Sequence, residues 1–408
     1  MIWLMHTPLA PPASPFPLLS RIEPVLAAIE GFAEFKVIRR AAFTTVDYGY
    51  MRAESFGCLV KDPPDAHFAA RLRREARGLK FDNEGGLVAR PFQKFFNLGE
   101  KPETQASALA WGEPHLVLDK LDGSLVHPFL IDDHLRWATR NGETPQAAQA
   151  AAHMMASGLP YEAFARALIA LGYTPLFEFT GPENRIVIRY ETACAFLLAA
   201  RRLTDGAYMR DDELRRLAAD AGIPVVRAWG HDIGSLREFI AHTQGLENAE
   251  GYVVRFASGE MIKLKAQAYA LRHSALSDIS SEKFALRVVL ENAEDDLAPL
   301  LPDEIADRLR RFAEAVRAAL ARRAEEMAVF LAAARAEDGQ DRKAYAARVF
   351  SQLPPALRPA AFKAWEGADV ARFLAEQLLR AATTQDRIEE ARPLLDGARW
   401  TLALTLEA

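Results

Sequence analysis

Apolar residues alternate with polar ones over much of the first two thirds of the chain, and they recur at helical spacing over the last third. Alternation is typical of strands, and a spacing of three or four residues is typical of amphipathic helices. The change falls at about Ala266, and the helical spacing is clearest at Ile305, Leu309, Phe312, Val316, Leu320, Met327 and Leu331. The pattern predicts an α+β domain with antiparallel sheets and flanking helices, residues 1–270, followed by an all-α domain, residues 271–408.

Turn residues between the apolar runs set the expected elements of the first domain. The expected helices are residues 20–32, a pair within 145–172, 211–221 and 236–242. The expected hairpins are residues 125–139 and 252–265. The other expected strands are residues 35–38, 43–50, 58–60, 175–179, 185–189 and 196–202. Gly158 separates the helix pair, and Asp132 with Asp133 turns the first hairpin.

Charge and composition limit the classes of function that are open to the chain. The net charge of -5 over 408 residues excludes a global basic field, so a nucleic-acid surface must be a local patch. Cys58 and Cys194 lie far apart without metal-ligand spacing, which predicts a reducing, cytoplasmic setting. The Pro-rich run at 8–17 interrupts any signal-like helix, and no apolar run is long enough to span a bilayer. No membrane partner is therefore expected.

One lysine stands where it could act as a nucleophile. Lys120 lies two residues ahead of the turn Asp122-Gly123-Ser124, inside otherwise strand-like sequence. A lysine there can be fixed at a strand end facing a cleft, and glycine lets a phosphate approach the backbone closely. To attack phosphorus the amine must lose its proton, and neighbouring cations or burial lower the pKa of an amine. Lys263 and Lys265 alternate on an expected strand, so both amines share one face, although an ordinary solvated face explains them equally well in isolation.

Two carboxylates stand where a strand would be expected to carry apolar residues. Glu178 lies between Phe177 and Phe179, and Glu250 precedes the apolar run after Gly251. A carboxylate in such surroundings is costly unless it accepts hydrogen bonds, for example from a ribose, or binds a metal. The competing interpretation is an exposed strand position.

Two basic stretches have competing interpretations. Residues 71–80 concentrate positive charge, either for a phosphate or on a solvated helix face. The arginines of the helical third alternate with glutamates, which favours a solvated face with ion pairs over an RNA site. They are Arg308, Arg310, Arg311, Arg317, Arg322 and Arg323.

The candidate residues belong to motifs that occur in a fixed order. These are Ala76-Arg77-Gly78, Arg90-Pro91-Phe92-Gln93-Lys94, Lys120-Leu121-Asp122-Gly123-Ser124, Phe177-Glu178-Phe179 with Asn184-Arg185-Ile186-Val187, Glu250-Gly251-Tyr252-Val253, and Lys263-Leu264-Lys265 followed by Tyr269. In these motifs the chain resembles the covalent nucleotidyltransferases, which include ATP-dependent DNA and RNA ligases and mRNA capping enzymes. It is most similar to the phage tRNA-repair RNA ligases, the RNA ligase 1 family, from about Tyr48 onward.

The resemblance implies a role for each matching position. Lys120 would form lysyl-AMP in an adenylyltransferase domain, residues 1–270, and Tyr269 would be needed for ligation. The implied ATP site consists of Tyr48, Arg77, Lys94, Lys120, Gly123, Arg140, Glu178, Glu250, Lys263 and Lys265. Asp295 and Asp296 match an acidic pair associated with a metal, whereas their sequence alone indicates carboxylates at a helix start. Arg140 departs from the family, which has a lysine there; arginine keeps the charge and adds a planar fork.

The implied activity is an ATP-dependent RNA ligase that joins 5′-phosphate and 3′-hydroxyl ends through lysyl-AMP and RNA-adenylate, with Mg²⁺. The implied partners are RNA, as tRNA or single-stranded ends, and a separate end-healing kinase or phosphatase. The helical domain would recognise structured RNA, since the β-barrel that usually follows the last lysine motif of DNA ligases and capping enzymes is not expected here. Two alternatives stay open: a DNA ligase or capping-type nucleotidyltransferase, and a non-catalytic RNA-binding module with the same fold.

Overall fold

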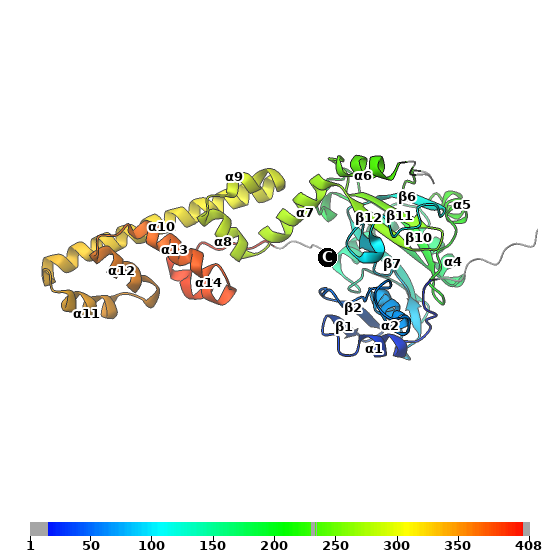
Figure 1. The fold of residues 1–408 in the computed structure, drawn as a ribbon, viewed down its shortest axis with the longest axis horizontal. Helices are drawn as coiled ribbons and strands as arrows, with labels where there is room; N and C mark the ends of the chain where they lie inside the picture. Colours follow the sequence, from blue (N-terminus) through cyan, green and yellow to red (C-terminus); the bar gives the residue numbers. More distant parts are fainter. Residues whose placement is uncertain (1–14, 230–232, 234, 403–408) are drawn as a thin grey trace, which may run out of the picture. The chain divides into compact units, whose positions relative to one another are not determined.

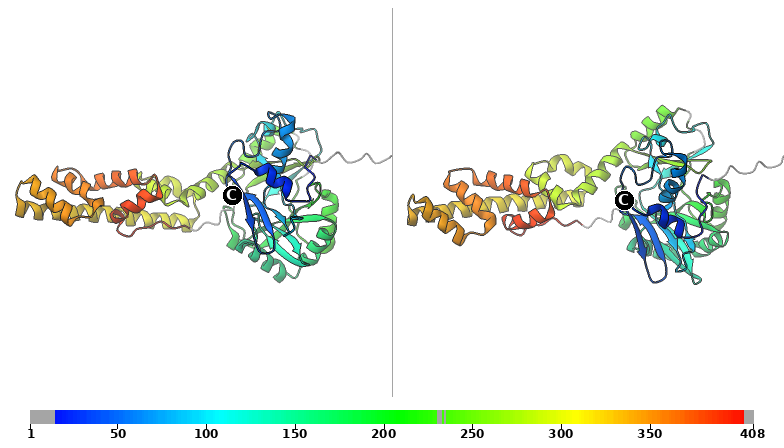
Figure 2. Two further views of the ribbon diagram at one scale, coloured as in Figure 1. Left: turned by 90° about the horizontal axis from the view of Figure 1, so that it is seen from below. Right: turned by 60° about the horizontal axis from the view of Figure 1, so that its bottom comes forward.

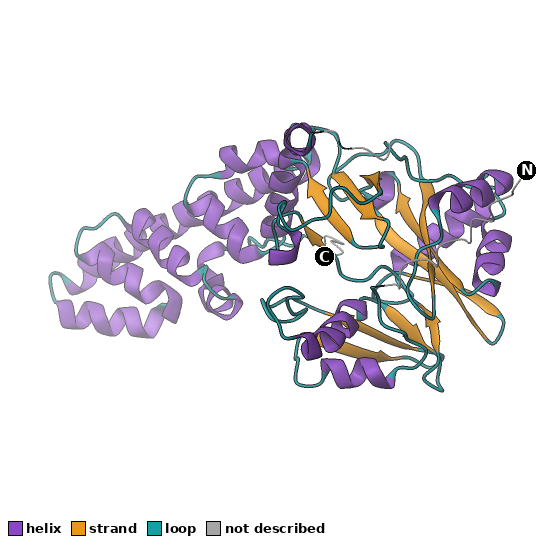
Figure 3. Ribbon diagram, turned by 45° about the vertical axis from the view of Figure 1, so that its right-hand side comes forward, coloured by secondary structure: helices purple, strands orange, loops and turns teal. Residues whose placement is uncertain are grey.

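The computed structural model describes residues 15–229, 233 and 235–402. The chain forms two compact units, and the boundary falls between Ala270 and Leu271. All strands of the described residues belong to the first unit, whereas the described part of the second unit consists of helices and loops (Figure 1, Figure 3). The predicted α+β class with a helical C-terminal region is confirmed.

The described strands of the first unit form three sheets of four strands each. The first sheet has the order β1 (Phe35–Arg39), β2 (Thr44–Tyr48), β3 (Leu79–Phe81), β4 (Leu87–Ala89). The second has the order β10 (Cys194–Arg202), β9 (Tyr173–Thr180), β7 (Ser124–Ile131), β8 (His134–Ala138). The third has the order β5 (Phe96–Asn97), β12 (Met261–Lys265), β11 (Gly251–Phe256), β6 (His115–Lys120). Neighbouring strands are antiparallel except β5 and β12, which are parallel.

Helices cover one face of the second sheet. The helices of the first unit that precede its last strand are α1 (Glu23–Ile29), α2 (Pro64–Glu75), α3 (Pro145–Ala156), α4 (Tyr161–Ala170), α5 (Asp211–Ala221) and α6 (Leu236–Gln244). Val126 and Phe177 of the sheet share a buried core with residues of α3, α4 and α5. Because side chains alternate along a strand, His127 and Glu178 lie on the opposite face. Phe129, on that same face, contacts Phe43 with ring centroids 5.0 Å apart, so this face meets residues of the first sheet.

Both predicted hairpins and the predicted helix pair are present. The β7–β8 hairpin turns through Asp132 and Asp133, whose φ angles are 50° and 60°. Short polar side chains tolerate this left-handed conformation, which suits a tight hairpin turn. Helices α3 and α4 flank Gly158, which also has a positive φ of 73°. The turn residues in the sequence therefore predicted these elements correctly.

Two predicted strands, residues 58–60 and 185–189, are wrong. Their backbone N–H groups donate to carboxylates instead of to a neighbouring strand. Cys58 N donates to Asp62 Oδ2 at 2.6 Å. Val187 N and Ile188 N both donate to Asp122 Oδ2 at 2.7 Å. Asp62 lies only four residues from Cys58, whereas Asp122 lies more than 60 residues from Val187 and Ile188, too far away to affect the local apolar pattern.

The basic run at 71–80 makes contacts with other parts of the first unit. It does not form a solvated helix face, which was one of its two interpretations. Arg73 donates to the carbonyls of Ser55 and Ala28, and Arg74 donates to those of Phe56 and Gly57. The neighbouring Glu75 is buried between two buried arginines, Arg90 at 3.0 Å and Arg201 at 2.7 Å. These contacts fix the end of α2 and the chain that follows it.

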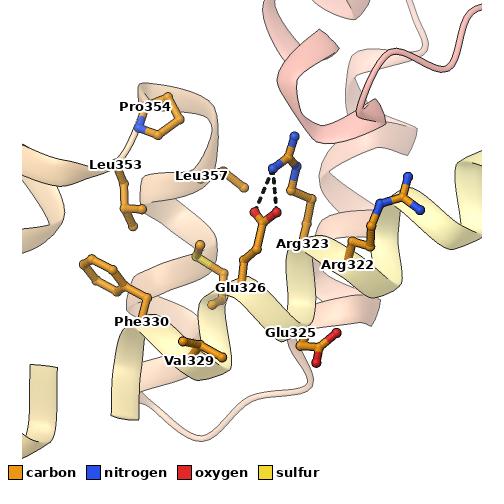
Figure 4. A pocket seen from close by; sticks show the side chains of 10 residues that line it. Arg322, Arg323, Glu325, Glu326, Val329, Phe330, Leu353, Pro354 and Leu357 are labelled. Carbon is orange, nitrogen blue, oxygen red and sulfur yellow. Dashed lines mark hydrogen bonds and ion pairs between the residues drawn. The ribbon is translucent and has the colours of Figure 1, made fainter. Parts of the chain in front are cut away.

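A long helix organises the second unit. Helices α7 (Gln267–Ile279), α8 (Glu282–Leu290), α9 (Glu294–Leu297), α10 (Asp303–Asp338), α11 (Arg342–Gln352), α12 (Arg358–Trp365), α13 (Val370–Ala381) and α14 (Gln385–Ala391) follow the last strand. The side chains of Leu309 and Val316 on α10 are buried, and α12 and α13 pack along α10 (Figure 1, Figure 2). Beside α10 lies an apolar groove that includes Phe330 and Leu353, with Arg323 and Glu326 paired at its edge (Figure 4). Among the described residues, no helix is both long and apolar enough to cross a membrane.

Candidate active site

The register of the third sheet brings Lys120, Glu250 and Lys265 together. Gly251 of β11 pairs with Lys120 of β6 on one side and with Lys265 of β12 on the other. Glu250 Oε1 lies 2.7 Å from Lys120 Nζ and 3.2 Å from Lys265 Nζ. The Glu250 side chain is 4% exposed, and the Lys120 side chain is 22% exposed. Burial alone would raise the pKa of Glu250, but the two ammonium groups outweigh burial and hold that pKa below its ordinary value.

Two glycines permit the close backbone approaches around Lys120. Gly251 has a φ of 136°, and a Cβ atom there would lie 2.0 Å from the carbonyl oxygen of Leu264. A Cβ atom on Gly123 would lie 2.3 Å from the carbonyl oxygen of Phe179. The sequence argument gave Gly123 a role in phosphate approach, and the structure adds another reason for glycine, which is the packing of this turn against β9.

Asp122 fixes the turn that follows Lys120. Its buried carboxylate accepts the two backbone N–H groups described above and also the hydroxyl of Tyr269, which donates to Oδ1 at 2.7 Å. Its own N–H donates to the hydroxyl oxygen of Tyr190 at 3.0 Å. Asp122 and Tyr190 were not among the predicted site residues. The Lys-x-Asp-Gly spacing was the signal for Asp122, whereas Tyr190 lies in no recognised motif.

Tyr269 is placed at this turn by the first residues of α7. Its side chain is 2% exposed, and the ammonium of Lys265 lies 5.1 Å from the centre of its ring. Burial and the charges of Glu250 and Asp122 raise the pKa of Tyr269 well above its ordinary value. The phenol therefore stays protonated and holds the start of α7 against the turn that follows Lys120.

A second group of predicted residues gathers around Tyr48 at the end of β2. The ring of Tyr48 lies 5.6 Å from Lys94 Nζ and 4.6 Å from the guanidinium carbon of Arg140. Burial alone would raise the pKa of Tyr48, but the charges of Arg77, Lys94 and Arg140 outweigh burial and lower it. Burial is also the main reason why the pKa of Lys94 is lowered. The site thus concentrates cations in a partly desolvated place.

Lys263 links the two groups electrostatically. Its ammonium lies 5.1 Å from the ring of Phe95. Burial, followed by the charges of Lys94, Lys120, Arg77 and Lys265, lowers the pKa of Lys263 well below its ordinary value. A polyphosphate would relieve the repulsion among these cations, because it would place several negative charges beside them. The predicted phosphate-binding residues therefore lie in one region of the first unit.

Comparison with known proteins decides the family. A family model described as "RNA ligase" matches residues 75–269. A protein of Thermovibrio ammonificans named "Putative RNA ligase" is 30% identical over 285 residues, which are 68% of this chain and 70% of the relative. The chain belongs to the RNA ligase family. Bacteriophage TS2126 RNA ligase 1 is also 30% identical, over 252 residues, and the chain covers 62% of that protein. The predicted RNA ligase family is confirmed.

Similar solved structures are RNA ligases as well. An archaeal ATP-dependent RNA ligase has a TM-score of 0.43 at 17% identity, over 60% of this chain and 62% of that chain. A Naegleria gruberi RNA ligase mutant with ATP and Mn has a TM-score of 0.32 at 20% identity, over 40% of this chain and 52% of that chain. These likenesses cover less of the chain than the Thermovibrio ammonificans relative does.

In this RNA ligase, Glu178 lies close to the turn that follows Lys120. It sits on β9, half-buried, on the face opposite the helices and in register with Leu125. Burial, together with the charges of Asp122, Glu178 and Glu250, raises the pKa of Tyr190 to about 12. Glu178 and Glu250 therefore lie within electrostatic range of the same hydroxyl, which agrees with the predicted grouping of the two carboxylates.

The predicted metal ligands of this RNA ligase belong to the second unit. Asp295 and Asp296 are exposed in the first turn of α9, and the neighbouring Glu294 pairs with Arg317 of α10. No group of three or more His, Cys, Asp or Glu side chains suited to a metal occurs among the described residues. The metal assignment of Asp295 and Asp296 stays a prediction.

Proposed function

We propose that this RNA ligase is ATP-dependent and that Lys120 carries AMP from ATP to an RNA 5′-phosphate. The observation that carries the proposal is the position of Lys120 at the end of β6, where it shares Glu250 with Lys265 beside a group of buried cations. Such a group favours a polyanion. An amine at a strand end among these cations is suited to attack an α-phosphate.

The first step forms a bond between Lys120 Nζ and the α-phosphorus and breaks the bond to the departing pyrophosphate. Before attack, Lys120 must leave Glu250 and lose its proton. Lys265, 3.2 Å from the same carboxylate oxygen, can remain as the counter-ion of Glu250. Lys263, Lys94 and Arg77 would stabilise the charge that develops on the phosphates and on pyrophosphate.

Mg²⁺ would neutralise phosphate charge and hold the reacting oxygens in line. Proteins commonly bind Mg²⁺ through one or two carboxylates together with substrate phosphates and water. Glu178 is half-buried near the turn and fits this pattern, whereas Asp122 already accepts three hydrogen bonds. Glu250 is paired with Lys120 and Lys265, so it is better suited to hold a ribose, or to exchange one ion-pair partner for another during the reaction.

In the second step AMP would pass to an RNA 5′-phosphate, and in the third a 3′-hydroxyl would displace AMP to seal the strand. We propose broken RNA, including tRNA with a cleaved anticodon loop, as the substrate class, and a cytoplasmic RNA-repair role in which a separate kinase or phosphatase prepares the ends. Recognition of RNA by residues 271–408 stays a prediction, as does the adenylyltransferase role of residues 1–270 as a domain. The resemblance in motif order supports these proposals.

The test follows a label from ATP to protein and then to RNA. The protein is incubated with α-labelled ATP and Mg²⁺, and then with 5′-phosphorylated RNA; we expect labelled protein that transfers its label to RNA. Lys120→Ala should abolish labelling, and Lys61→Ala, an exposed lysine outside the site, should not. Label from GTP, or sealing of nicked DNA in preference to RNA, would favour the capping-type or DNA-joining alternative. A Lys120→Ala protein that labels as well as the wild type would refute the nucleophile assignment.

A further inference from the structure

Asp47 and Arg140 form a buried ion pair at the edge of the candidate active site. Asp47 lies on β2, whose five residues are all buried, and its side chain is 2% exposed. Its Oδ2 lies 3.1 Å from Nε of Arg140, whose side chain is 10% exposed. Nothing in the local sequence pattern connects Asp47 with a residue that follows β8, so the sequence predicts no role for it.

Three contacts fix Arg140 in one orientation. Asp47 holds the Nε edge of the guanidinium, and the ring of Tyr48 lies under its face at 4.6 Å. Lys80 fixes the backbone, because its Nζ donates to the carbonyl oxygens of Gly78, Thr139 and Arg140 at 2.7, 3.2 and 3.1 Å. A flexible side chain is thereby ordered at its base, its edge and its face.

Stability alone does not account for this arrangement. Burial raises the pKa of Asp47 although Arg140, Arg77 and Lys80 all oppose the rise. Asp47 Oδ1 and Arg140 Nη1 are buried without a hydrogen-bond partner among the described residues. Buried ion pairs with unsatisfied atoms generally stabilise a fold no better than apolar side chains of similar size. The pair is therefore better explained by what it does for Arg140.

Arg140 belongs to the cations that would bind the phosphates. It shares the ring of Tyr48 with Lys94, and Arg77 acts electrostatically on Tyr48, Lys94 and Lys263 alike. An arginine recognises phosphate through a planar fork, so its orientation matters more than that of a lysine. A residue that sets this orientation would act on phosphate binding through Arg140.

We propose that Asp47 is a positioning residue that orients Arg140 toward the triphosphate of ATP and toward the departing pyrophosphate. The inference rests on the proposed function and adds a residue to it. The ligand class is a nucleoside triphosphate or inorganic pyrophosphate. The final joining step needs neither, since an RNA that is already adenylylated carries its AMP with it.

The test separates phosphate binding from folding and from joining. Two assays compare the wild type with Asp47→Asn, Arg140→Ala and the double variant. The first measures adduct formation over a range of ATP concentrations. The second measures the reverse reaction of the preformed adduct over a range of inorganic pyrophosphate concentrations. We expect each single variant to raise the KM for both ligands about tenfold, with a smaller change in kcat, and the double variant to be no worse than the worse single variant. For Asp47→Asn, sealing of 5′-adenylylated RNA should stay within about twofold of wild type, because this step uses neither ATP nor pyrophosphate.

A control removes a partly buried carboxylate, Asp211, which is 16% exposed and pairs with two arginines, Arg215 and Arg255. Asp211 Oδ1 lies 3.3 Å from Arg255 Nη2 in the same unit, so Asp211→Asn tests the effect of losing such a pair elsewhere. It should leave the KM values for ATP and pyrophosphate unchanged. If Asp47→Asn does not fold, Arg140→Lys tests the pair from its other member and should raise the KM values for ATP and for pyrophosphate.

Three results would overturn the inference. In the first, the double variant shows the sum of the two single effects. In the second, Asp47→Asn lowers adduct formation and sealing of adenylylated RNA equally, which is the behaviour of a general structural defect. In the third, Asp47→Asn leaves both KM values unchanged, and the proposed function survives. A wild-type protein that forms no adduct with ATP would overturn the proposed function and this inference together.

Discussion

Cations of the first unit and arginines of the second unit illustrate two different uses of positive charge. In the first unit, Lys94 and Lys263 lie over aromatic rings, at 5.3 Å from Phe96 and 5.1 Å from Phe95. In the second unit, arginines of α10 pair with carboxylates: Arg310 with Asp307, Arg317 with Glu294, Arg322 with Asp396, and Arg323 with Glu326 (Figure 4). The first arrangement leaves charge for a ligand, whereas the second neutralises it within the protein.

The difference has an energetic consequence. Exposed ion pairs such as those of α10 contribute little to stability and are weakened further by salt. Buried ammonium groups beside other cations oppose folding, because their charged forms are desolvated and repelled. A protein keeps such groups where function requires them, which is the usual trade between stability and activity. We therefore expect the chemistry to take place in the first unit.

Among the cations around Lys120, the largest effect is expected for loss of Lys263. Lys263→Met keeps the length of the side chain and removes its charge, so the phosphates lose one preorganised cation. We expect the rate of adduct formation with ATP to fall by about 100-fold or more. The measurement is the initial rate of labelling, with Lys61→Met as the control for a lysine outside the site. A rate within threefold of wild type would show that Lys263 is an ordinary strand residue.

The sequence predicted this grouping of cations only in part. Alternation on a strand was enough to place Lys263 and Lys265 on one face, whereas the Lys-x-Asp-Gly pattern is weak alone and indicated Lys120 only together with the other motifs. Alternation does not say which strands are neighbours, so the pairing of Gly251 with both Lys120 and Lys265 could be known only from the fold. Motif order supplied the missing information through the family.

Other parts of the fold depend on contacts that local sequence does not record. Residues 185–189 have the apolar pattern of a strand, but Asp122 takes the backbone N–H groups of Val187 and Ile188. Arg73 and Arg74 belong to a run that could have faced solvent, but they donate to carbonyl oxygens of distant residues. Asp47 and Arg140 meet only because the first and second sheets are brought together. Each case needs a partner far away in the sequence, which periodicity cannot supply.

The second largest effect is expected for loss of Glu282, which belongs to an ion pair of the second unit. The carboxylate of Glu282 accepts hydrogen bonds from Nη1 and Nη2 of Arg392 at 2.7 and 2.8 Å. It also accepts hydrogen bonds from the side-chain amide of Gln385 and from the backbone N–H of Trp400. These hydrogen bonds, which outweigh the opposing effect of burial, lower the pKa of Glu282 to about 2. We expect Glu282→Gln to lower the free energy of unfolding by about 2 kcal/mol at pH 7.

The pH dependence of that change has a definite sign. In the unfolded chain a glutamate has a pKa of about 4.3. The unfolded state therefore binds the proton first, and the contribution of Glu282 is complete above that pH and is lost as pH falls toward 2. Denaturant unfolding at pH 7, 4 and 3 measures the loss. Glu366→Gln, in an exposed pair with Lys363, serves as a control in which no change is expected. An equal difference between wild type and Glu282→Gln at all three pH values would contradict this account.

A smaller effect, of opposite sign, is expected when Lys263→Met is tested for stability. Removing a desolvated charge among other cations should raise the free energy of unfolding by about 1 kcal/mol at pH 7, a shift of about 2–4 °C in Tm. Because the pKa of Lys263 is lowered in the folded state, the unfolded state binds more protons below about pH 10.4. The wild type therefore gains stability as pH rises, and the difference from the variant should shrink toward pH 10. A variant that is less stable than wild type at pH 7 would contradict the idea that the charge opposes folding.

The smallest effect distinguishes two neighbouring arginines of α10. Arg310 pairs with Asp307, whereas the described residues provide no ion pair for Arg311, and both side chains are exposed. If the second unit binds RNA through phosphates, Arg311→Ala should raise the KM for RNA about twofold to threefold and reduce its salt dependence, because one phosphate contact is lost. Arg310→Ala should leave the KM for RNA unchanged, since its charge is already neutralised. Joining assays at two salt concentrations measure both variants. Equal and negligible effects would mean that this face of α10 is only a solvated surface, as the alternation of arginine with glutamate first indicated.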